Sequence, residues 1–200
     1  YEGMDVGEEG TVGLITYMRT DSVRTADEAM AEVRGYIGST FEKGMLPETP
    51  NVYKSKKGAQ DAHEAIRPTS VHRTPEAMRK YLTDEQLALY TIIWQRFVAS
   101  QMAPAVYDQT AVDIAAGDCG FRATGSVLRF AGFTKVYEES RVDKNVDGED
   151  EGKGPDESRL LPPINDAETC DKRELRPEQH FTKPPPRYTE ASLIRALEEN

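Results

Sequence analysis

A tyrosine, an arginine and an aspartate alternate in Ile-Thr-Tyr-Met-Arg-Thr-Asp-Ser, residues 15–22. In an extended chain, side chains two positions apart share a face, so Tyr17, Arg19 and Asp21 would project together. A phenol with a pKa of about 10 is a poor nucleophile at neutral pH. A nearby guanidinium favours the phenolate and can also bind phosphate oxygens. The trio therefore suits attack on a phosphodiester, although spacing alone favours the simpler interpretation of a solvated strand end.

A second polar stretch, Asp-Ala-His-Glu-Ala-Ile-Arg-Pro-Thr at 61–69, contains an imidazole, two carboxylates and a guanidinium. His63 could donate to a phosphate or move a proton. Arg67 follows four residues later and would share its face if this stretch is a helical turn. An ordinary polar turn is the commoner origin of such a run. The sequence offers no partner ligands for a metal ion here, so we predict no metal site.

The charge around this stretch is locally basic. Residues 52–80 contain seven basic and three acidic residues, a net +4, whereas the whole chain has 25 Lys+Arg against 35 Asp+Glu and a net charge of −10. This balance excludes a globally basic nucleic-acid binder and leaves a local patch for phosphate contacts, with a solvated loop as the alternative. We expect no membrane span, and the two distant cysteines, Cys119 and Cys170, fit a reducing cytoplasm.

The elements that must position these residues are indicated by periodicity and capping signals. A β-branched run predicts a strand over 11–17, and Thr25 with Glu28 has the spacing of a capping box for a helix over 26–37. Thr83 and Gln86 form a second such box before the clearest helical pattern. We expect helix signals at 75–81 and this clearest helix over 84–102, followed by strands over 106–114, 121–127 and 127–137. Loops are expected over 43–60 and 138–157, and short β or extended segments near 160 and over 172–181.

Three blocks of the sequence resemble one family, the type IA DNA topoisomerases to which bacterial DNA topoisomerase I belongs. Residues 13–22, Gly-Leu-Ile-Thr-Tyr-Met-Arg-Thr-Asp-Ser, resemble its active-site signature, and 61–68, Asp-Ala-His-Glu-Ala-Ile-Arg-Pro, resemble its second block. Residues 181–198, with the core Pro-Pro-Arg-Tyr-Thr-Glu-Ala-Ser, resemble its third block. The blocks occur in the family's order. Topoisomerase III and reverse gyrase share the tyrosine motif, so the subtype stays open.

The resemblance implies an ATP-independent isomerase that cuts one DNA strand, passes another through the break and religates, relaxing negatively supercoiled DNA. Tyr17 would be the nucleophile that forms a 5′-phosphotyrosine, and Arg19 would lie at the scissile phosphate. His63 would bind a DNA phosphate, with Arg67 and Asp21 in the DNA-binding set. The implied partner is DNA, preferably single-stranded, bound by a monomer in the cytoplasm at the nucleoid.

The resemblance also implies an α+β fold. Residues 1–104 would form a mainly helical lid domain bearing Tyr17, followed by a β-rich partial arch segment over 105–183 with the acidic loop 138–157, and 184–200 would begin the next helical domain. The family's Mg²⁺ site lies in a Toprim domain, which nothing in these 200 residues matches. We therefore expect a piece of a longer enzyme, inactive alone. The rival hypothesis is a non-catalytic single-stranded-DNA-binding scaffold; a nuclease would need a metal cluster or a stronger base.

Overall fold

A computed structural model describes residues 1–20, 22–53, 63–137, 161–179, 181–182, 184 and 187–199. The described chain contains both helices and strands, and it divides into two compact units. One unit comprises Tyr1–Val106 and Arg129–Glu138, and the other comprises Tyr107–Leu128 and Glu139–Asn200. The two sequence motifs with candidate chemistry both belong to the first unit. The acidic loop expected over 138–157 lies outside the described residues.

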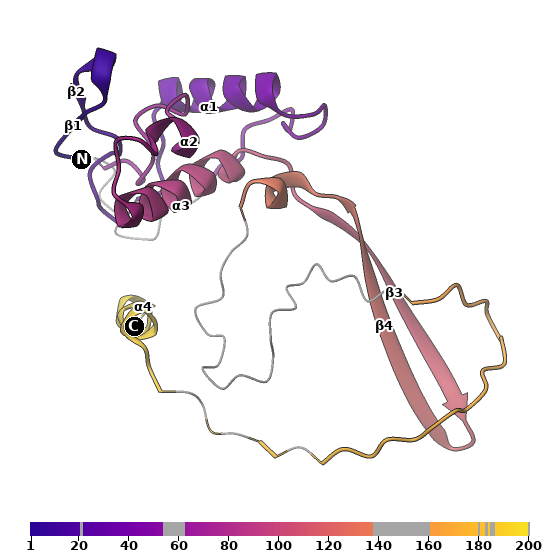
Figure 1. Cartoon of the computed structure of the whole chain (residues 1–200). Coiled ribbons are helices and arrows are strands. Elements are labelled where there is room, and N and C mark those ends of the chain that lie inside the picture. Colours follow the sequence, from indigo (N-terminus) through magenta and orange to yellow (C-terminus); the bar gives the residue numbers. More distant parts are fainter. Residues whose placement is uncertain are drawn as a thin grey trace. The chain divides into compact units, whose positions relative to one another are not determined.

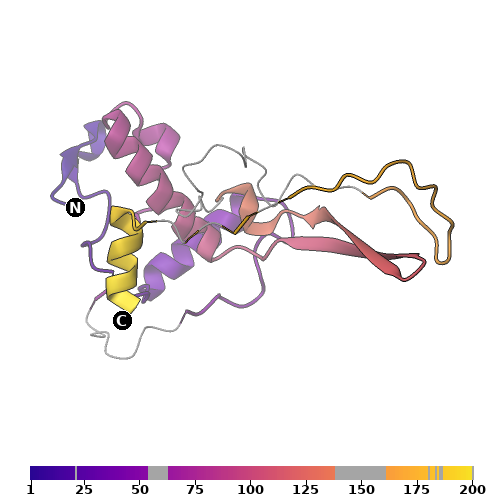
Figure 2. The same cartoon turned by 90° about the horizontal axis from the view of Figure 1, so that it is seen from below.

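Helices dominate the first unit. They are α1 (Asp27–Thr40), α2 (Pro75–Met78) and α3 (Asp84–Ser100), and α2 lies beside the start of α3 in both views (Figure 1, Figure 2). Helix α3 begins as predicted, because the Thr83 hydroxyl accepts from the Gln86 N–H and the Gln86 side chain accepts from the Thr83 N–H. The short α2 is capped by Thr74, whose hydroxyl accepts from the Ala77 N–H.

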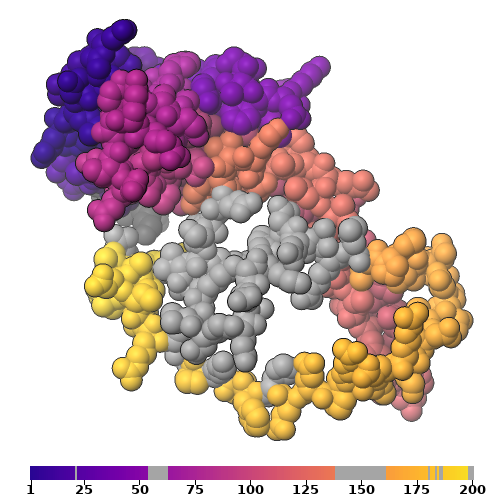
Figure 3. All heavy atoms as spheres, viewed as in Figure 1, coloured from indigo at the N-terminus to yellow at the C-terminus, as the bar shows by residue number. Residues whose placement is uncertain are grey.

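The core of the first unit is built from the inner faces of α1 and α3. Val33 and Ile37 of α1 and Trp94 and Val98 of α3 are buried. The Trp94 indole also donates to the Val71 carbonyl at 2.9 Å, so this core is tied to the loop that follows the second motif. Residues of 129–137 join the same body, which the space-filling view shows as a continuous mass (Figure 3).

The predicted strand over 11–17 is wrong in extent. The structure has only two short strands there, β1 (Met4–Asp5) and β2 (Thr11–Val12), which pair antiparallel around the 3₁₀ turn η1 (Gly7–Glu9). From Leu14 to Thr16 the chain instead bonds to residues 67–69, some fifty positions later. A local pattern of β-branched residues cannot show that residues 11–12 pair with β1 while residues 14–16 pair with residues 67–69.

The predicted capping box at α1 is also wrong. Ala26 is the residue that precedes the helix, and neither Thr25 nor Glu28 caps it. The Ala26 N–H donates instead to the Glu64 carboxylate at 2.8 Å. An acceptor from a distant motif has replaced the local one.

The loop that follows α1 is tied to the end of α3. Gln101 is buried, and its side-chain amide exchanges two hydrogen bonds with the Asn51 backbone. The Asn51 side chain donates to the carbonyls of Ser100 and Met102, which the helix itself leaves without partners. These contacts anchor the described part of the 43–60 loop, although it contains neither helix nor strand.

Strands β3 (Val106–Ala116) and β4 (Cys119–Phe130) form a two-stranded hairpin (Figure 1). The two strands predicted over 121–137 are one strand followed by the 3₁₀ turn η2 (Gly132–Lys135). The described residues 161–179 contain no strand, so the extended segments expected over 160–181 do not become β-structure where they are described. Helix α4 (Glu190–Glu199) lies within residues 184–200, where a helical domain is expected to begin, and the Thr189 hydroxyl caps its start by accepting from the Ser192 N–H.

Candidate active site

Backbone pairing joins the tyrosine motif to the histidine motif. Ile15 and Pro68 form an antiparallel bridge, flanked by a bond from the Thr16 N–H to the Arg67 carbonyl and one from the Thr69 N–H to the Leu14 carbonyl, both 2.9 Å. The residues just before Tyr17 in the first motif are therefore paired with residues that follow His63 in the second motif. This pairing brings together residues that are more than forty positions apart.

Two hydroxyl groups strengthen this junction. The Thr16 hydroxyl donates to the Ala65 carbonyl at 2.7 Å and accepts from the Arg67 N–H at 3.0 Å. The buried Ser22 hydroxyl donates to the His63 carbonyl at 2.7 Å. One hydroxyl lies on each side of Tyr17 and Arg19, so this segment is held at one end against the backbone of Ala65 and Arg67 and at the other against the backbone of His63.

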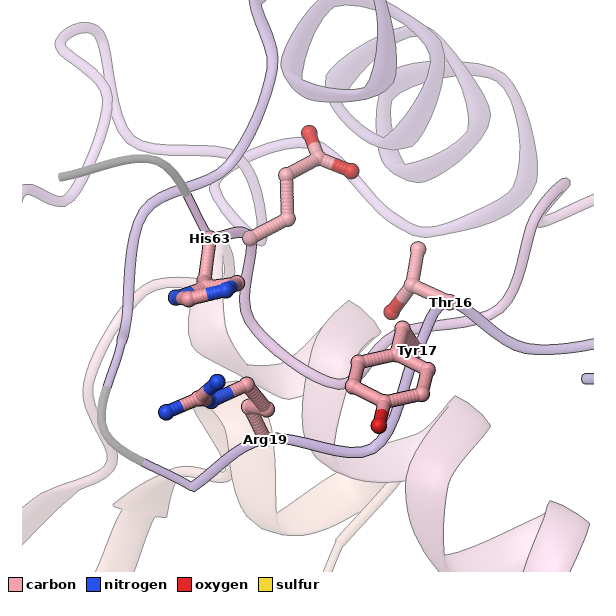
Figure 4. A pocket seen from close by; sticks show the side chains of 5 residues that line it. Thr16, Tyr17, Arg19 and His63 are labelled. Atoms are coloured by element: carbon pink, nitrogen blue, oxygen red, sulfur yellow. The ribbon is translucent and has the colours of Figure 1, made fainter. Parts of the chain in front are cut away.

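Between the two motifs lies a pocket of about 300 Å³, lined by Thr16, Tyr17, Arg19, His63 and Glu64. In Figure 4 the side chains of Arg19 and His63 extend toward each other, and the Tyr17 ring lies across from both. The Tyr17 side chain is 54% exposed, so a large substrate can reach it. The structure thus places a phenol, a guanidinium and an imidazole around one opening.

The Tyr17 ring has one further aromatic neighbour. The Tyr1 ring packs edge-on against it with a centroid separation of 5.1 Å. Such T-shaped pairs are favourable. Tyr1 therefore contacts the Tyr17 ring from one side.

The other predicted site residues are placed differently. Arg67 does not line the pocket; its guanidinium pairs with Glu64 at 2.9 Å and donates to the Pro68 carbonyl at 3.0 Å. Only 11% of the Arg67 side chain is exposed. Asp21 lies outside the described residues. The prediction that Arg67 and Asp21 contact DNA stays a prediction.

Sequence reasoning missed Thr16 and Glu64 as site residues. Both occur within the quoted motifs, but their types gave no reason to separate them from the neighbouring polar residues. Thr16 lies in a β-branched run in which threonine is common, and Glu64 lies in a polar turn that contains other charged residues. To find these two residues, the sequence would have had to show which positions of each motif contact a substrate and which hold the backbone in place.

The basic stretch over 52–80 is largely engaged within the first unit where it is described. Arg73 pairs with Glu9 at 2.7 Å, and the Lys80 ammonium lies 4.7 Å from the Tyr81 ring centre. Lys54, Lys56 and Lys57 lie outside the described residues. Two of the described arginines in this stretch, Arg67 and Arg73, are thus offset by carboxylates.

No group of three or more His, Cys, Asp or Glu side chains is arranged to hold a metal ion among the residues that the structure describes. The one carboxylate lining the described pocket, Glu64, already accepts from Ala26 and Arg67. These residues do not fit a Mg²⁺ site. The described helices also include none that is long and apolar enough to cross a membrane.

Comparison with known proteins identifies the family. A family model described as DNA topoisomerase matches residues 1–200. The chain is 51% identical over 201 residues to "DNA topoisomerase 1" of Xylella fastidiosa strain Temecula1 and to that of strain 9a5c, covering 100% of this chain and 24% of each relative. It is also similar to the solved full-length topoisomerase I of Thermotoga maritima, with a TM-score of 0.66, 34% identity, and coverage of 96% of this chain and 28% of that chain.

These matches run over both motifs that line the pocket, and the chain spans about a quarter of the length of the relatives it matches. The resemblance seen in the sequence is therefore confirmed at the level of the family. The chain belongs to the DNA topoisomerase family.

Proposed function

We propose that this chain is the nucleophile-bearing part of a type IA topoisomerase, which cleaves one DNA strand through a 5′-phosphotyrosine intermediate. The observation that carries the proposal is that Tyr17, Arg19 and His63, from two motifs far apart in sequence, line the same pocket. A nucleophile and two phosphate-binding groups around one opening is the arrangement that phosphoryl transfer needs. Strand passage and relaxation of negatively supercoiled DNA are proposed for the longer protein.

In the proposed reaction the Tyr17 oxygen attacks the scissile phosphorus. One phosphorus–oxygen bond forms to Tyr17, and the bond to the 3′-oxygen breaks. The phenol loses its proton and the departing 3′-oxygen gains one. Because one phosphoester replaces another, the reverse attack by the 3′-hydroxyl reseals the strand without an external energy source such as ATP.

Arg19 and His63 would act on the phosphate rather than on the nucleophile alone. The guanidinium can donate two parallel hydrogen bonds to phosphate oxygens, and the imidazole can donate a third. Both extend into the same side of the pocket (Figure 4). These fixed donors would stabilise part of the negative charge that develops on the phosphate oxygens.

The Mg²⁺ requirement is proposed to be met outside the part of the chain that the structure describes, because those described residues do not fit such a site. Mg²⁺ would supply further charge stabilisation at the phosphate when it is bound. We propose that the longer enzyme works as a monomer on single-stranded DNA segments. The rival scaffold hypothesis is weakened by the pairing of Arg67 and Arg73 with carboxylates, since a phosphate-binding surface needs exposed positive charge.

The decisive experiment replaces Tyr17 with Phe in the full-length protein. The change removes one oxygen and leaves the ring, so we expect DNA binding to persist while the covalent adduct and plasmid relaxation disappear. Tyr1→Phe is the matched control, because it removes the hydroxyl of the ring that packs against Tyr17. A Tyr17→Phe enzyme that still forms the adduct would refute the proposal.

A further inference from the structure

Glu64 connects three parts of the site through one carboxylate. Its Oε1 accepts from the Ala26 N–H at 2.8 Å, and its Oε2 accepts from the Arg67 Nη2 at 2.9 Å. Its side chain is 29% exposed and lines the pocket with Tyr17, Arg19 and His63. The carboxylate therefore belongs both to the pocket wall and to the structure behind it.

The contact with Ala26 fixes the start of α1. An alanine before a helix has no side chain to accept from the first N–H groups, and a carboxylate at a helix N-terminus is favoured by the partial positive charge there. The fourteen residues of α1 carry the buried Val33 and Ile37, so this helix is anchored in the core. Glu64 thus joins the second motif to a rigid element.

Two neighbouring hydrogen bonds complete this attachment. The Ser22 hydroxyl donates to the His63 carbonyl, and the Ala65 N–H donates to the Arg24 carbonyl, both at 2.7 Å. The backbone is therefore fixed at the His63 carbonyl and at the Ala65 N–H, on either side of Glu64, and the Glu64 side chain fixes the same stretch to α1. Losing the carboxylate would leave the His63 segment with fewer constraints at the position that faces the pocket.

Proton transfer is a poor role for Glu64. Each of its oxygens already accepts a hydrogen bond, one from a backbone N–H and one from a guanidinium. A general base needs an oxygen within reach of the proton it removes, and both of these oxygens are committed to other donors. The contacts favour a role in holding other groups.

We propose that Glu64 is a positioning residue for strand cleavage, which acts by holding the His63 imidazole toward the pocket through α1 and Arg67. This inference rests on the proposed function, because it requires His63 to contact the scissile region of DNA. A displacement of about 1 Å at a reacting centre can cost about a hundredfold in rate. We expect Glu64→Ala to lower the cleavage rate of the full-length enzyme by about 10- to 100-fold.

The test is a double-mutant cycle in the full-length enzyme, with single-turnover cleavage of a labelled single-stranded oligonucleotide as the readout. Glu64→Ala is measured in the natural background and again with His63→Ala. If Glu64 acts through His63, its loss should matter in the first background and change the rate by less than about twofold in the second. An equal loss in both backgrounds would overturn the proposal, because it would show an effect independent of His63.

Glu64→Gln supplies the conservative comparison. The amide keeps an oxygen for the Ala26 N–H, but it loses the charge that pairs with Arg67. We expect a cleavage rate between those of the natural enzyme and Glu64→Ala. If Glu64→Ala does not fold, the same cycle is carried out with Glu64→Gln, and a Gln variant with the full rate would overturn the proposal.

Glu42→Ala is the matched control, because it also removes a carboxylate that is paired with a cation, Lys135, but does not line the pocket. We expect this variant to cleave DNA at the natural rate. A loss like that of Glu64→Ala would overturn the proposal, since any lost ion pair would then suffice. If His63→Ala has no effect on cleavage, both the proposed phosphate-binding role of His63 and the positioning role of Glu64 are refuted. If His63→Ala slows cleavage and Glu64→Ala does not, only the positioning role of Glu64 is refuted.

Discussion

Replacing Thr16 with Val tests whether the junction between the two motifs depends on one hydroxyl. Valine has nearly the same shape as threonine, so the backbone bond from the residue 16 N–H to the Arg67 carbonyl can remain. The change removes the hydroxyl that donates to the Ala65 carbonyl and accepts from the Arg67 N–H. Both backbone groups are then left without that partner beside the pocket.

The expected cost follows from these two bonds. A hydrogen bond within a protein contributes about 1 kcal/mol net, so losing two gives about 2 kcal/mol. That is about a thirtyfold fall in the folding equilibrium constant. The control, Thr16→Ser, keeps the hydroxyl and removes one half-buried methyl group, for which we expect about 0.4 kcal/mol.

Trp94 provides the signal for this measurement. It is the one tryptophan in the chain, it is buried in the first unit, and its indole bonds to Val71 a few residues after the second motif. With a urea dependence of about 2 kcal/mol per molar, Thr16→Val should lower the unfolding midpoint by about 1 M. If Thr16→Val and Thr16→Ser shift the midpoint equally, the hydroxyl does not hold the motifs together and the reasoning fails.

Three further predictions follow from the same contacts. Gly132→Ala should destabilise the first unit by about 3 kcal/mol in urea unfolding, because Gly132 has a φ of 52° and an added Cβ would meet the Ala103 carbonyl oxygen. The control is Gly35→Ala, in an open helical position, which should not destabilise the unit. Burial raises the pKa of Tyr90 to about 12, so its phenolate absorbance should appear only near that pH and be missing in Tyr90→Phe. Since the pKa of folded Tyr90 exceeds the usual 10, its contribution to the free energy of unfolding is complete below about pH 10 and is lost as the pH rises through 12. A Tyr90 contribution that is lost on acidification instead would contradict this. Finally, the 200-residue chain should bind a single-stranded oligonucleotide weakly in a gel shift and release it by physiological salt, given its net charge of −10; tight, salt-resistant binding would contradict this.

The sequence predicts local structure well where the signals are local. The α3 helix begins where Thr83 and Gln86 indicate, and the start of α4 is capped in the same local way by Thr189. Both starts depend on side chains within three residues of the bonds they cap. The same kind of signal misplaces the cap of α1, because Glu64, 38 positions away, supplies the acceptor.

The site is predicted in part for the same reason. The motifs identify Tyr17, Arg19 and His63 as candidates, and the pocket brings these three together. Their meeting depends on pairing between residues near 15 and residues near 68, which no local pattern encodes. Arg67 does not join these three, because its guanidinium pairs with Glu64, and its contact with DNA stays a prediction.

The charges at the pocket bear on what the proposed reaction needs from the longer protein. Of the described residues that line the pocket, Arg19 is the one permanent cation, and Glu64 contributes a carboxylate whose charge is offset by Arg67 behind it. If Tyr17 is the nucleophile as proposed, the phosphate under attack gains negative charge, and these described residues would supply only part of its stabilisation. We therefore expect further positive charge to come from outside the described residues, and the full-length protein to form the adduct at Tyr17 with the contacts between the two motifs unchanged.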